Sequence, residues 1–505
     1  MAPRTFTTRL ICPLTARRAA RMRADLAAAA RQGADAVECR LDFLNPPPDP
    51  AQLKDLLAQP PVEVIVTNRP RRQGGHFAGS EPQRLQLLRD AAALKPAFVD
   101  VEIDTPRADW PDGRIIHSHH DLEKVPENLE EIAAELEASE AAVNKIVFAA
   151  AGPEDALRAL DLLRACRKPT IALAMGEAGL VSRILARKFG AFGTFAALSK
   201  GAESAPGQPT IEELKGLYRW DAITAETMVC GVIGCPIAHS MSPAIHNAAF
   251  AAADINAVYV PLRIEPGAEN FNRFMDALLE RLWLDWRGLS VTIPHKENAL
   301  AYVGPDNCDE LAGKIGAINT ITIGRDGELR GDNTDYAAAI DALCRAMGIG
   351  REDLTGRSVA VLGAGGAARA IVAALAHYGA DVMIYNRTVA RAEKLAEEFS
   401  CRAAGLDALK DMQAEIVINC TPIGMHPHVD ASPLERIGPP VKVVFDTIYN
   451  PVETRLLRIA GQAGVRTVTG LEMFVNQAVA QFEIWIGRPG PREVMRKTVM
   501  ERLCP

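Results

Sequence analysis

The stretch Arg357-Ser-Val-Ala-Val-Leu-Gly-Ala-Gly-Gly-Ala-Ala-Arg369 decides the fold of the second half of the chain. An apolar run of strand length ends in a glycine-rich turn, and apolar residues at helical spacing follow as far as His377. Gly363 allows a tight turn, Gly365 lets the backbone approach a pyrophosphate, and Ala368 permits close packing of helix on strand. This G-x-G-x-x-A pattern predicts a dinucleotide-binding unit. For the motif taken alone, a glycine-rich turn without a ligand is the alternative.

The following strand indicates which dinucleotide the turn binds. It runs over Asp381–Tyr385 and leads into Asn386, Arg387 and Thr388, with Arg391 one turn further on. In NAD-binding units this strand ends in a carboxylate that binds the ribose hydroxyls. Arginine in its place suits a 2′-phosphate, because a guanidinium forms charge-assisted hydrogen bonds with phosphate oxygens. The sequence therefore predicts a Rossmann-type lobe with NADP(H) as its cofactor.

The first half of the chain alternates short β-branched runs with helical stretches. We expect strands over residues 6–12, 36–41, 62–67, 97–103, 114–117, 145–148, 170–174 and 192–196. We expect helices over residues 16–32, 82–94, 128–139, 153–167, 180–188 and 210–220. Repeated strand–helix units of this length predict a closed parallel (β/α)8 barrel. An open doubly wound sheet is the alternative.

In (β/α)8 barrels the functional residues lie just beyond the carboxyl ends of the strands. The unusual polar residues of the first half do so. They are Glu38, Arg40, Arg69, Glu102, His119, His120, Asp121, Lys145, Ser204 and Gln208. A structural ion pair explains any one of them, because charges inside a small barrel are costly unless they are paired or used. Their gathering at one rim favours a site.

Composition excludes several classes of protein. The 505 residues, 48% hydrophobic and with a net charge of −7, suit two to four globular domains and no nucleic-acid partner. No run approaches the ~20 apolar residues of a membrane span, so we expect no membrane partner. The ten cysteines form no CxxC pair and no His or Cys cluster has ligand spacing, so we expect no disulfide framework and no metal. No leader is visible at the N-terminus, which predicts a cytoplasmic protein.

Two sets of motifs resemble known enzyme families. Residues 1–222 resemble type I 3-dehydroquinate dehydratase in Glu38-Cys-Arg-Leu-Asp42, Arg69 with Gly74-Gly75, Ser118-His-His-Asp121, Lys145-Ile, Met175-Gly176 with Ser182-Arg183, and Ser204-Ala-Pro-Gly-Gln208. Residues 229–505 resemble shikimate dehydrogenase in His239-Ser-Met-Ser-Pro243, Val291-Thr-Ile-Pro-His-Lys296, Gly316-Ala-Ile-Asn-Thr320, Asp332-Asn-Thr-Asp335, Asn419-Cys-Thr-Pro-Ile-Gly424, Tyr449-Asn-Pro451 and Gly470 through Gln481. The order of the two halves is that of plant bifunctional enzymes.

The resemblance implies a division of the chain into four segments. Residues 1–222 are expected to form the dehydratase barrel, 228–335 an α/β substrate-binding lobe, and 336–470 the Rossmann-type NADP lobe. Residues 471–505 are expected to form helices that return to the substrate lobe. The fold class is thus α/β, with a barrel followed by a two-lobed dehydrogenase.

The resemblance also implies roles in the dehydratase half. Lys145 is expected to form a Schiff base with the substrate carbonyl, which creates an electron sink for removal of the α proton. His120 is the expected general base and later the acid that helps water leave, and Arg183 the ligand of the substrate carboxylate. Hydroxyls and the ring would be held by Glu38, Arg40, Arg69, Ser204 and Gln208. Gln73 replaces a glutamate that the family often has near the histidine, which predicts a weaker base.

In the dehydrogenase half the implied acid–base pair is Lys296 with Asp335, and a surface ion pair is the alternative. The implied substrate ligands are Ser240, Ser242, Thr292, Asn319, Tyr449 and Gln477, with Gln481 as a further candidate. The implied cofactor-binding residues are Gly363, Ala364, Gly365, Gly366, Ala367, Asn386, Arg387, Thr388, Arg391, Thr421 and Gly470. Ser290 departs from the asparagine that many relatives have before Val-Thr, at the expected substrate pocket.

The function implied is a bifunctional one. The first half would dehydrate 3-dehydroquinate to 3-dehydroshikimate, and the second would reduce that product with NADPH to shikimate. Two alternatives remain at this point: a dehydrogenase that prefers quinate, and a half that is kept only as a binding or regulatory scaffold. Intact Lys145, His120, Lys296 and Asp335 argue against the scaffold. The sequence predicts no particular oligomeric state.

Overall fold

The computed structural model describes residues 7–238 and 240–503. They divide into two compact units, one of residues 7–238 with 256–285 and the other of residues 240–255 with 286–503. The sheet of the first half and the Rossmann-type sheet of the second fall into different units.

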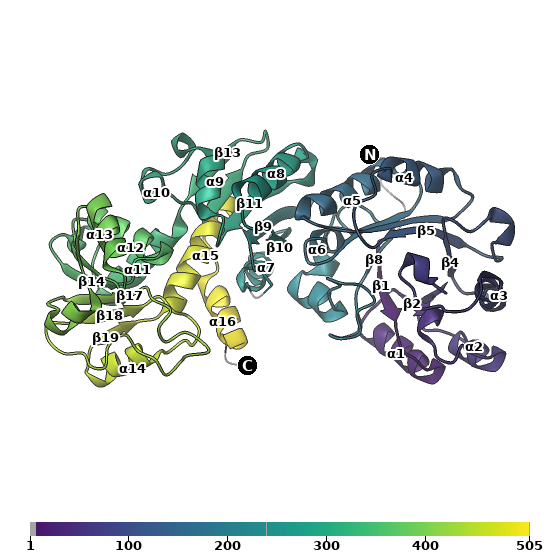
Figure 1. Cartoon of the computed structure of the whole chain (residues 1–505), viewed down its shortest axis with the longest axis horizontal. Helices are drawn as coiled ribbons and strands as arrows, with labels where there is room; N and C mark the ends of the chain where they lie inside the picture. The colour runs from purple at the N-terminus through teal and green to yellow at the C-terminus, as the bar shows by residue number, and fades with distance from the viewer. Residues whose placement is uncertain (1–6, 239, 504–505) are drawn as a thin grey trace. The chain divides into compact units, whose positions relative to one another are not determined.

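An eight-stranded parallel barrel forms the first half of the chain (Figure 1). Its strands are β1 Arg9–Leu14, β2 Ala36–Arg40, β3 Glu63–Thr67, β4 Phe98–Glu102, β5 Ile115–Asp121, β6 Val143–Ala149, β7 Thr170–Met175 and β8 Gly193–Phe195. Their order, β7-β6-β5-β4-β3-β2-β1-β8, is sequential around the sheet. The N–H of Phe192, just before β8, donates to the carbonyl of Thr170 on β7 at 2.8 Å, which brings the two edges together. The predicted barrel is confirmed, and the open sheet is wrong.

The two-residue period of a strand separates the barrel interior into an apolar floor and a polar upper layer. On β6, Val143 belongs to the buried apolar cluster and Lys145 is the next residue on the same face. On β4, Phe98 belongs to that cluster, and Asp100 and Glu102 follow it on the same face. The same step of two leads from Ala36 to Glu38 on β2, from Ile65 to Thr67 on β3 and from Ile116 to Ser118 on β5. The polar side chains of Glu38, Thr67, Asp100, Glu102, Ser118 and Lys145 therefore lie above a floor of packed hydrocarbon. His119 and Asp121 were expected at the same rim, but they lie on the other face of β5 and do not line the barrel pocket.

Helices follow most of the barrel strands. They are α1 Ala19–Arg31, α2 Pro50–Leu56, α3 Glu81–Ala92, α4 Leu129–Ala138, α5 Pro153–Ala165 and α6 Leu180–Ile184.

Three predicted boundaries of the first half are wrong. Strand β5 continues to Asp121, so His119 and His120 lie within the strand and not after it. The helix predicted over 210–220 is a single π turn, Glu213–Leu217, followed by a 3-10 turn, Trp220–Ala222. The helix predicted to reach residue 188 ends at Ile184. The predicted start of the first strand at Phe6 lies outside the described residues, and β1 begins at Arg9.

The substrate-lobe segment contains short parallel and antiparallel ladders. Strand β9, Met228–Gly234, pairs in parallel with β10, Ala257–Arg263, and α8, Ala268–Leu279, follows. In the other unit, β11 Trp286–Val291, β12 Thr320–Ile323 and β13 Leu329–Asp332 form an antiparallel run. Three helices complete this segment: α7 Ser242–Ala252, α9 Lys296–Val303 and α10 Glu310–Ile315.

A six-stranded parallel sheet in the order β16-β15-β14-β17-β18-β19 forms the Rossmann-type lobe (Figure 1). The strands are β14 Ser358–Leu362, β15 Asp381–Tyr385, β16 Arg402–Ala404, β17 Ile416–Asn419, β18 Val443–Asp446 and β19 Arg466–Val468. The helices are α11 Thr334–Met347, α12 Gly366–His377, α13 Val389–Glu398, α14 Arg455–Gln462, α15 Gly470–Ile486 and α16 Arg492–Leu503. The strand order reverses between β14 and β17, and doubly wound sheets bind their ligands at that point.

Gly470 is required where α15 begins. A Cβ there would lie 2.3 Å from the carbonyl oxygen of Thr447 and 2.4 Å from that of Ile448, and neither backbone atom can yield easily. The start of α15 is thereby packed directly on the segment that follows β18.

We predict that Gly470→Ala lowers the free energy of unfolding by about 1–3 kcal/mol, because the added methyl group overpacks this contact. Urea unfolding of the full chain measures the change. Gly461→Ala on α14 is the control, since no described atom lies within 4 Å of its Cβ position. It should stabilise the protein by about 0.5–1 kcal/mol. Equal effects of the two substitutions would contradict the packing argument.

Candidate active sites

One pocket at the carboxyl ends of the barrel strands brings together all the residues that the sequence analysis assigned to the dehydratase site. These are Glu38, Arg40, Arg69, His120, Lys145, Arg183, Ser204 and Gln208. Gln73, Leu122, Val147, Leu173, Met175 and Phe195 also line it.

Lys145 is buried between two carboxylates. Its Nζ donates to Oε1 of Glu38 at 3.0 Å and to Oδ2 of Asp100 at 2.9 Å, and it lies 4.6 Å from the centre of the Phe195 ring. Thr67 donates its hydroxyl to the same oxygen of Glu38 at 2.9 Å. A buried amine at the middle of a strand, with its position defined by two acceptors, has the geometry of a preorganised nucleophile.

Arg69 connects Lys145 to a wider ion network. Its Nη2 lies 2.9 Å from Oδ2 of Asp100, and its Nη1 donates to Oε1 of Glu102 at 2.9 Å and to the hydroxyl of Ser118 at 2.8 Å. The positive charges of Arg69 and Lys145 hold the pKa of Asp100 far below its usual range despite burial. Asp100 is therefore ionised and holds Lys145 in place.

His120 enters the pocket from β5 beside Gln73. Its Nδ1 lies 3.4 Å from Oε1 of Gln73. Burial, together with the positive charges of Arg69 and Lys145, lowers the pKa of His120 well below its usual range. The imidazole is therefore neutral at pH 7 and able to accept a proton.

Arg183 is an unusual group in this pocket. It is buried on α6, and its Nε has no hydrogen-bond partner among the residues that the structure describes. Burial lowers its pKa to about 10. The Nε2 of Gln208 is likewise buried without a described partner, whereas its Oε1 accepts the backbone N–H of Ser204 at 2.9 Å. Unpaired buried donors are costly, so this side of the pocket fits an anionic ligand with oxygen acceptors.

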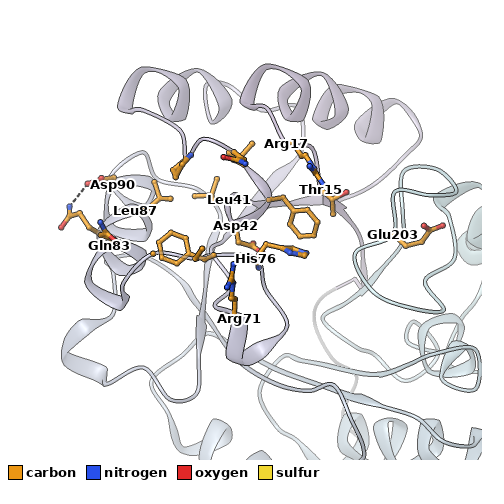
Figure 2. A pocket seen from close by; sticks show the side chains of 18 of the residues that line it. Thr15, Arg17, Leu41, Asp42, Arg71, His76, Gln83, Leu87, Asp90 and Glu203 are labelled. Atoms are coloured by element: carbon orange, nitrogen blue, oxygen red, sulfur yellow. Dashed lines mark hydrogen bonds between the residues drawn. The ribbon is translucent and has the colours of Figure 1, made fainter.

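Figure 2 shows the residues that line a second cavity on the barrel, which has a volume of about 880 Å³. This cavity and the pocket that contains Lys145 share a wall, because Asp42 lines the second cavity and accepts both Nε and Nη2 of Arg40 at 2.9 and 2.7 Å. Asp42 also accepts the backbone N–H of His76 at 3.1 Å. Asp42, which lines the second cavity, thus fixes the orientation of Arg40, which lines the first pocket.

The dehydrogenase half contains the predicted lysine–carboxylate pair. Lys296 begins α9 and Asp335 lies in the first turn of α11, and Nζ of the lysine is 2.5 Å from Oδ2 of the carboxylate. Both side chains are partly exposed. Asn333 caps α11 by accepting the N–H of Asp335 at 3.1 Å, which fixes the carboxylate. The pair can deliver a proton to a group that binds beside it.

Around this pair the structure connects several predicted substrate ligands. Asn319 accepts the N–H of Thr334 at 2.8 Å, and its backbone carbonyl accepts the N–H of Val291 at 2.7 Å. Gln481 on α15 donates to the hydroxyl of Thr320 at 3.1 Å and accepts the hydroxyl of Ser290 at 2.8 Å. Ser290, which stands where many relatives have asparagine, therefore orients the side chain of Gln481.

The remaining predicted ligands lie just outside helices or strands, except for Ser242 at the start of α7 and Gln477 in the middle of α15. Ser240 precedes α7 and accepts the backbone N–H of Ser242 at 3.3 Å. Thr292 directly follows β11. Tyr449 stacks on Phe474 with ring centres 4.6 Å apart. Gln477, on the same helix as Phe474, donates to its carbonyl at 3.1 Å. His239 of the motif lies outside the described residues.

The glycine-rich turn has the shape that a dinucleotide requires. Gly363 has a φ of +110°, and a Cβ there would lie 3.1 Å from the carbonyl oxygen of Cys420. Apart from its chain neighbours and the backbone of α12 itself, no described atom lies within 4 Å of the Cβ position of Gly365 or Gly366, so space is open at the N-terminus of α12. Ala364 and Ala367 flank this opening in the sequence. Backbone N–H groups at a helix N-terminus bind phosphate, so the residues present fit the cofactor.

The segment that follows β15 fits a 2′-phosphate. Asn386 donates its side-chain N–H to the carbonyl of Thr388 at 2.8 Å, which closes the loop. Arg387 and Arg391 are exposed, and no carboxylate in the described part of the chain pairs with either. Thr421 follows β17 and donates its hydroxyl to Oδ1 of Asn419 at 2.7 Å.

Asp100 contacts both Lys145 and Arg69 but was not among the site residues predicted from the sequence. Its signal was present, because a carboxylate two residues after Phe98 in an otherwise apolar strand faces the barrel interior. Among the described residues no group of three or more His, Cys, Asp or Glu side chains has the geometry of a metal site. No described helix is long and apolar enough to span a bilayer.

Family models match both halves of the chain. Residues 10–225 match type I 3-dehydroquinase, and residues 232–321 match the shikimate dehydrogenase substrate binding domain. Residues 347–455 match shikimate / quinate 5-dehydrogenase, and residues 470–500 match the shikimate 5'-dehydrogenase C-terminal domain.

Similar proteins and structures agree with these matches. Shikimate dehydrogenase (NADP(+)) of Methanosarcina barkeri is 43% identical over 54% of this chain and 98% of its own. A crystal structure of shikimate dehydrogenase in complex with NADP+ has a TM-score of 0.51 and 38% identity, and the match covers 56% of this chain and 98% of that one. The chloroplastic bifunctional 3-dehydroquinate dehydratase/shikimate dehydrogenase of Arabidopsis thaliana is 39% identical over 96% of this chain and 83% of its own. The chain therefore belongs to the family of bifunctional 3-dehydroquinate dehydratase/shikimate dehydrogenases.

Proposed function

We propose that the chain dehydrates 3-dehydroquinate to 3-dehydroshikimate in its barrel and reduces that product to shikimate with NADPH in its second half. The observation that carries the proposal is the pocket in which Lys145, His120 and Arg183 meet. The family membership supports both activities.

Lys145 acts as the nucleophile of the first reaction. Its amine attacks the substrate carbonyl and water leaves, which forms an imine that accepts electrons when the α proton is removed. Glu38 and Asp100 hold the nitrogen on either side and stabilise the positive charge of the protonated imine. Hydrolysis of the imine releases the product and restores the amine.

His120 moves the proton. Its neutral imidazole takes the α proton and then gives a proton to the β-hydroxyl, which leaves as water. Arg183 binds the substrate carboxylate, since that guanidinium has an unused donor in the pocket. The other proposed ligands of the substrate are Glu38, Arg40, Arg69, Ser204 and Gln208.

In the second reaction Lys296, held by Asp335, donates a proton to the oxygen of the carbonyl that is reduced. NADPH, when bound, supplies the reducing equivalents. We assign its binding to the turn of Gly363, Ala364, Gly365, Gly366 and Ala367, with Asn386, Arg387, Thr388, Arg391, Thr421 and Gly470. We assign substrate binding to Ser240, Ser242, Thr292, Asn319, Tyr449 and Gln477.

Domain limits and location complete the proposal. We propose the limits 1–222 for the barrel, 228–335 for the substrate lobe, 336–470 for the NADP lobe and 471–505 for the C-terminal helices. In support, α16 packs on α7 of the substrate lobe. A cytoplasmic location stays a prediction from the sequence, and the Arabidopsis relative is named chloroplastic.

Ultraviolet absorbance of the full chain with 3-dehydroquinate tests this function. The absorbance of the conjugated enone should grow without cofactor and then fall when NADPH is added, and NADH should replace NADPH poorly. NADPH consumption without any enone would contradict the dehydratase and favour a quinate-type reduction.

We predict that Gln73→Glu moves the acidic limb of the dehydratase pH profile upward by about one to three pH units. A carboxylate 3.4 Å from Nδ1 stabilises the imidazolium and raises the pKa of His120 from its lowered value, so the base is lost at a higher pH as the solution is acidified. Gln32→Glu, which places the same charge on an exposed residue at the end of α1, is the control. An unmoved limb would show that His120 is not the titrating base.

We predict that Lys296→Met slows the reduction of 3-dehydroshikimate by about 10²–10⁴-fold, because the proton donor is lost. Dehydratase turnover, measured on the same preparation, should not change. Lys314→Met, which removes an exposed lysine paired with Glu310 on α10, should leave both rates intact. Reduction at the normal rate by Lys296→Met would assign the proton to another group.

A further inference from the structure

A row of side chains with alternating charges runs from the outer surface of the barrel through Lys145 to Glu38. Each contact along it joins side chains of opposite sign. In order they are Glu81, Arg84, Glu102, Arg69, Asp100, Lys145 and Glu38. All but Glu81 are buried. The proposed catalytic lysine is thus the sixth member of a connected row and not one half of an isolated pair.

Arg84 is the member furthest from the pocket that is still fully enclosed. It lies on α3 with no exposed surface and does not line the pocket. Its Nη1 donates to Oε2 of Glu102 at 2.5 Å and to the carbonyl of Asn68 at 3.3 Å. Its Nη2 donates to the hydroxyl of Thr105 at 3.1 Å and to Glu81 at 2.6 Å. A guanidinium with four hydrogen-bond partners is held in one orientation.

Glu102 divides its two oxygens between two arginines. Oε2 accepts Arg84 and Oε1 accepts Nη1 of Arg69 at 2.9 Å. The orientation of the carboxylate therefore sets the plane of the Arg69 guanidinium, whose other nitrogen lies 2.9 Å from Asp100. Asp100 in turn accepts Lys145 at 2.9 Å. Movement of Arg84 would be transmitted through four charge-assisted contacts to the lysine nitrogen.

We propose that Arg84 is a positioning residue of the dehydratase: it holds Glu102, and through Glu102 and Arg69 it fixes Asp100 against Lys145. This inference rests on the proposed function of Lys145. Without Arg84 the buried Glu102 carboxylate has only Arg69 as a cationic partner and competes with Asp100 for it. A displacement of about 1 Å at a catalytic group can slow a reaction by about 10²-fold.

The test is a set of full-length variants assayed for both activities. Arg84→Met should lower kcat for dehydration by about 10- to 100-fold and leave KM for 3-dehydroquinate within about twofold, because Arg84 does not reach the substrate. Arg84→Lys keeps the charge and should recover part of the loss. Arg89→Met is the matched control, since Arg89 lies on the same helix and forms a partly exposed pair with Asp109. Reduction of 3-dehydroshikimate should stay constant throughout.

The double variant Arg84→Met, Glu102→Gln guards against a folding defect, because it leaves no unpaired buried carboxylate. It should fold and remain as slow as Glu102→Gln alone, since the two residues act in series. The proposal is overturned if the double variant turns over at the wild-type rate. It is also overturned if Arg84→Met changes KM alone, or slows dehydration only in proportion to its unfolded fraction. Lys145→Met separates the two claims: if that variant still dehydrates the substrate, the proposed function of Lys145 is wrong whatever Arg84 does.

Discussion

The buried contact of Lys145 with Glu38 and Asp100 is the constraint on which the barrel half of this protein depends. An ammonium at the centre of a barrel is tolerated only with compensating charge, and removal of one partner from such a pair is strongly destabilising. Asp100 is itself held by Arg69, and Arg69 by Glu102. The polar layer above the apolar floor is therefore a connected network of charges, and the same contacts that make the burial of Lys145 possible also fix the position of this proposed nucleophile.

In the second half of the chain, the groups of the candidate site lie at the N-terminal ends of helices and not inside a barrel. Lys296 and Asp335 stand at the N-terminal ends of α9 and α11, and the glycine-rich turn precedes α12. Partly exposed groups need no compensating network, so this pair is simpler than the one in the barrel. The strand order of the Rossmann-type sheet reverses between β14 and β17, and doubly wound sheets bind their ligands at such a point.

Much of this arrangement could be predicted from the sequence. Short β-branched runs between helical stretches located the barrel strands, and the turn at Gly363 with Arg387 indicated the NADP lobe. The prediction failed where tertiary packing, and not the local sequence, determines the structure. Strand β5 continues through His120 because β6 pairs with it as far as Asp121, which local residue preference does not reveal. The position of Asp100 in an apolar strand indicates that it faces the barrel interior, but its contact with Lys145 does not follow from any local pattern. Arg84 was missed because its role arises from a contact with Glu102 in a distant part of the sequence.

Borohydride reduction of the full chain in the presence of 3-dehydroquinate tests the central claim most directly, because it converts the proposed imine into a stable bond. Mass spectrometry of the digested protein should show the dehydroquinate-derived adduct on the peptide that contains Lys145, and Lys145→Met should show none. An adduct on another lysine, or full dehydratase turnover without any trapped adduct, would contradict the account of a lysine nucleophile held between Glu38 and Asp100.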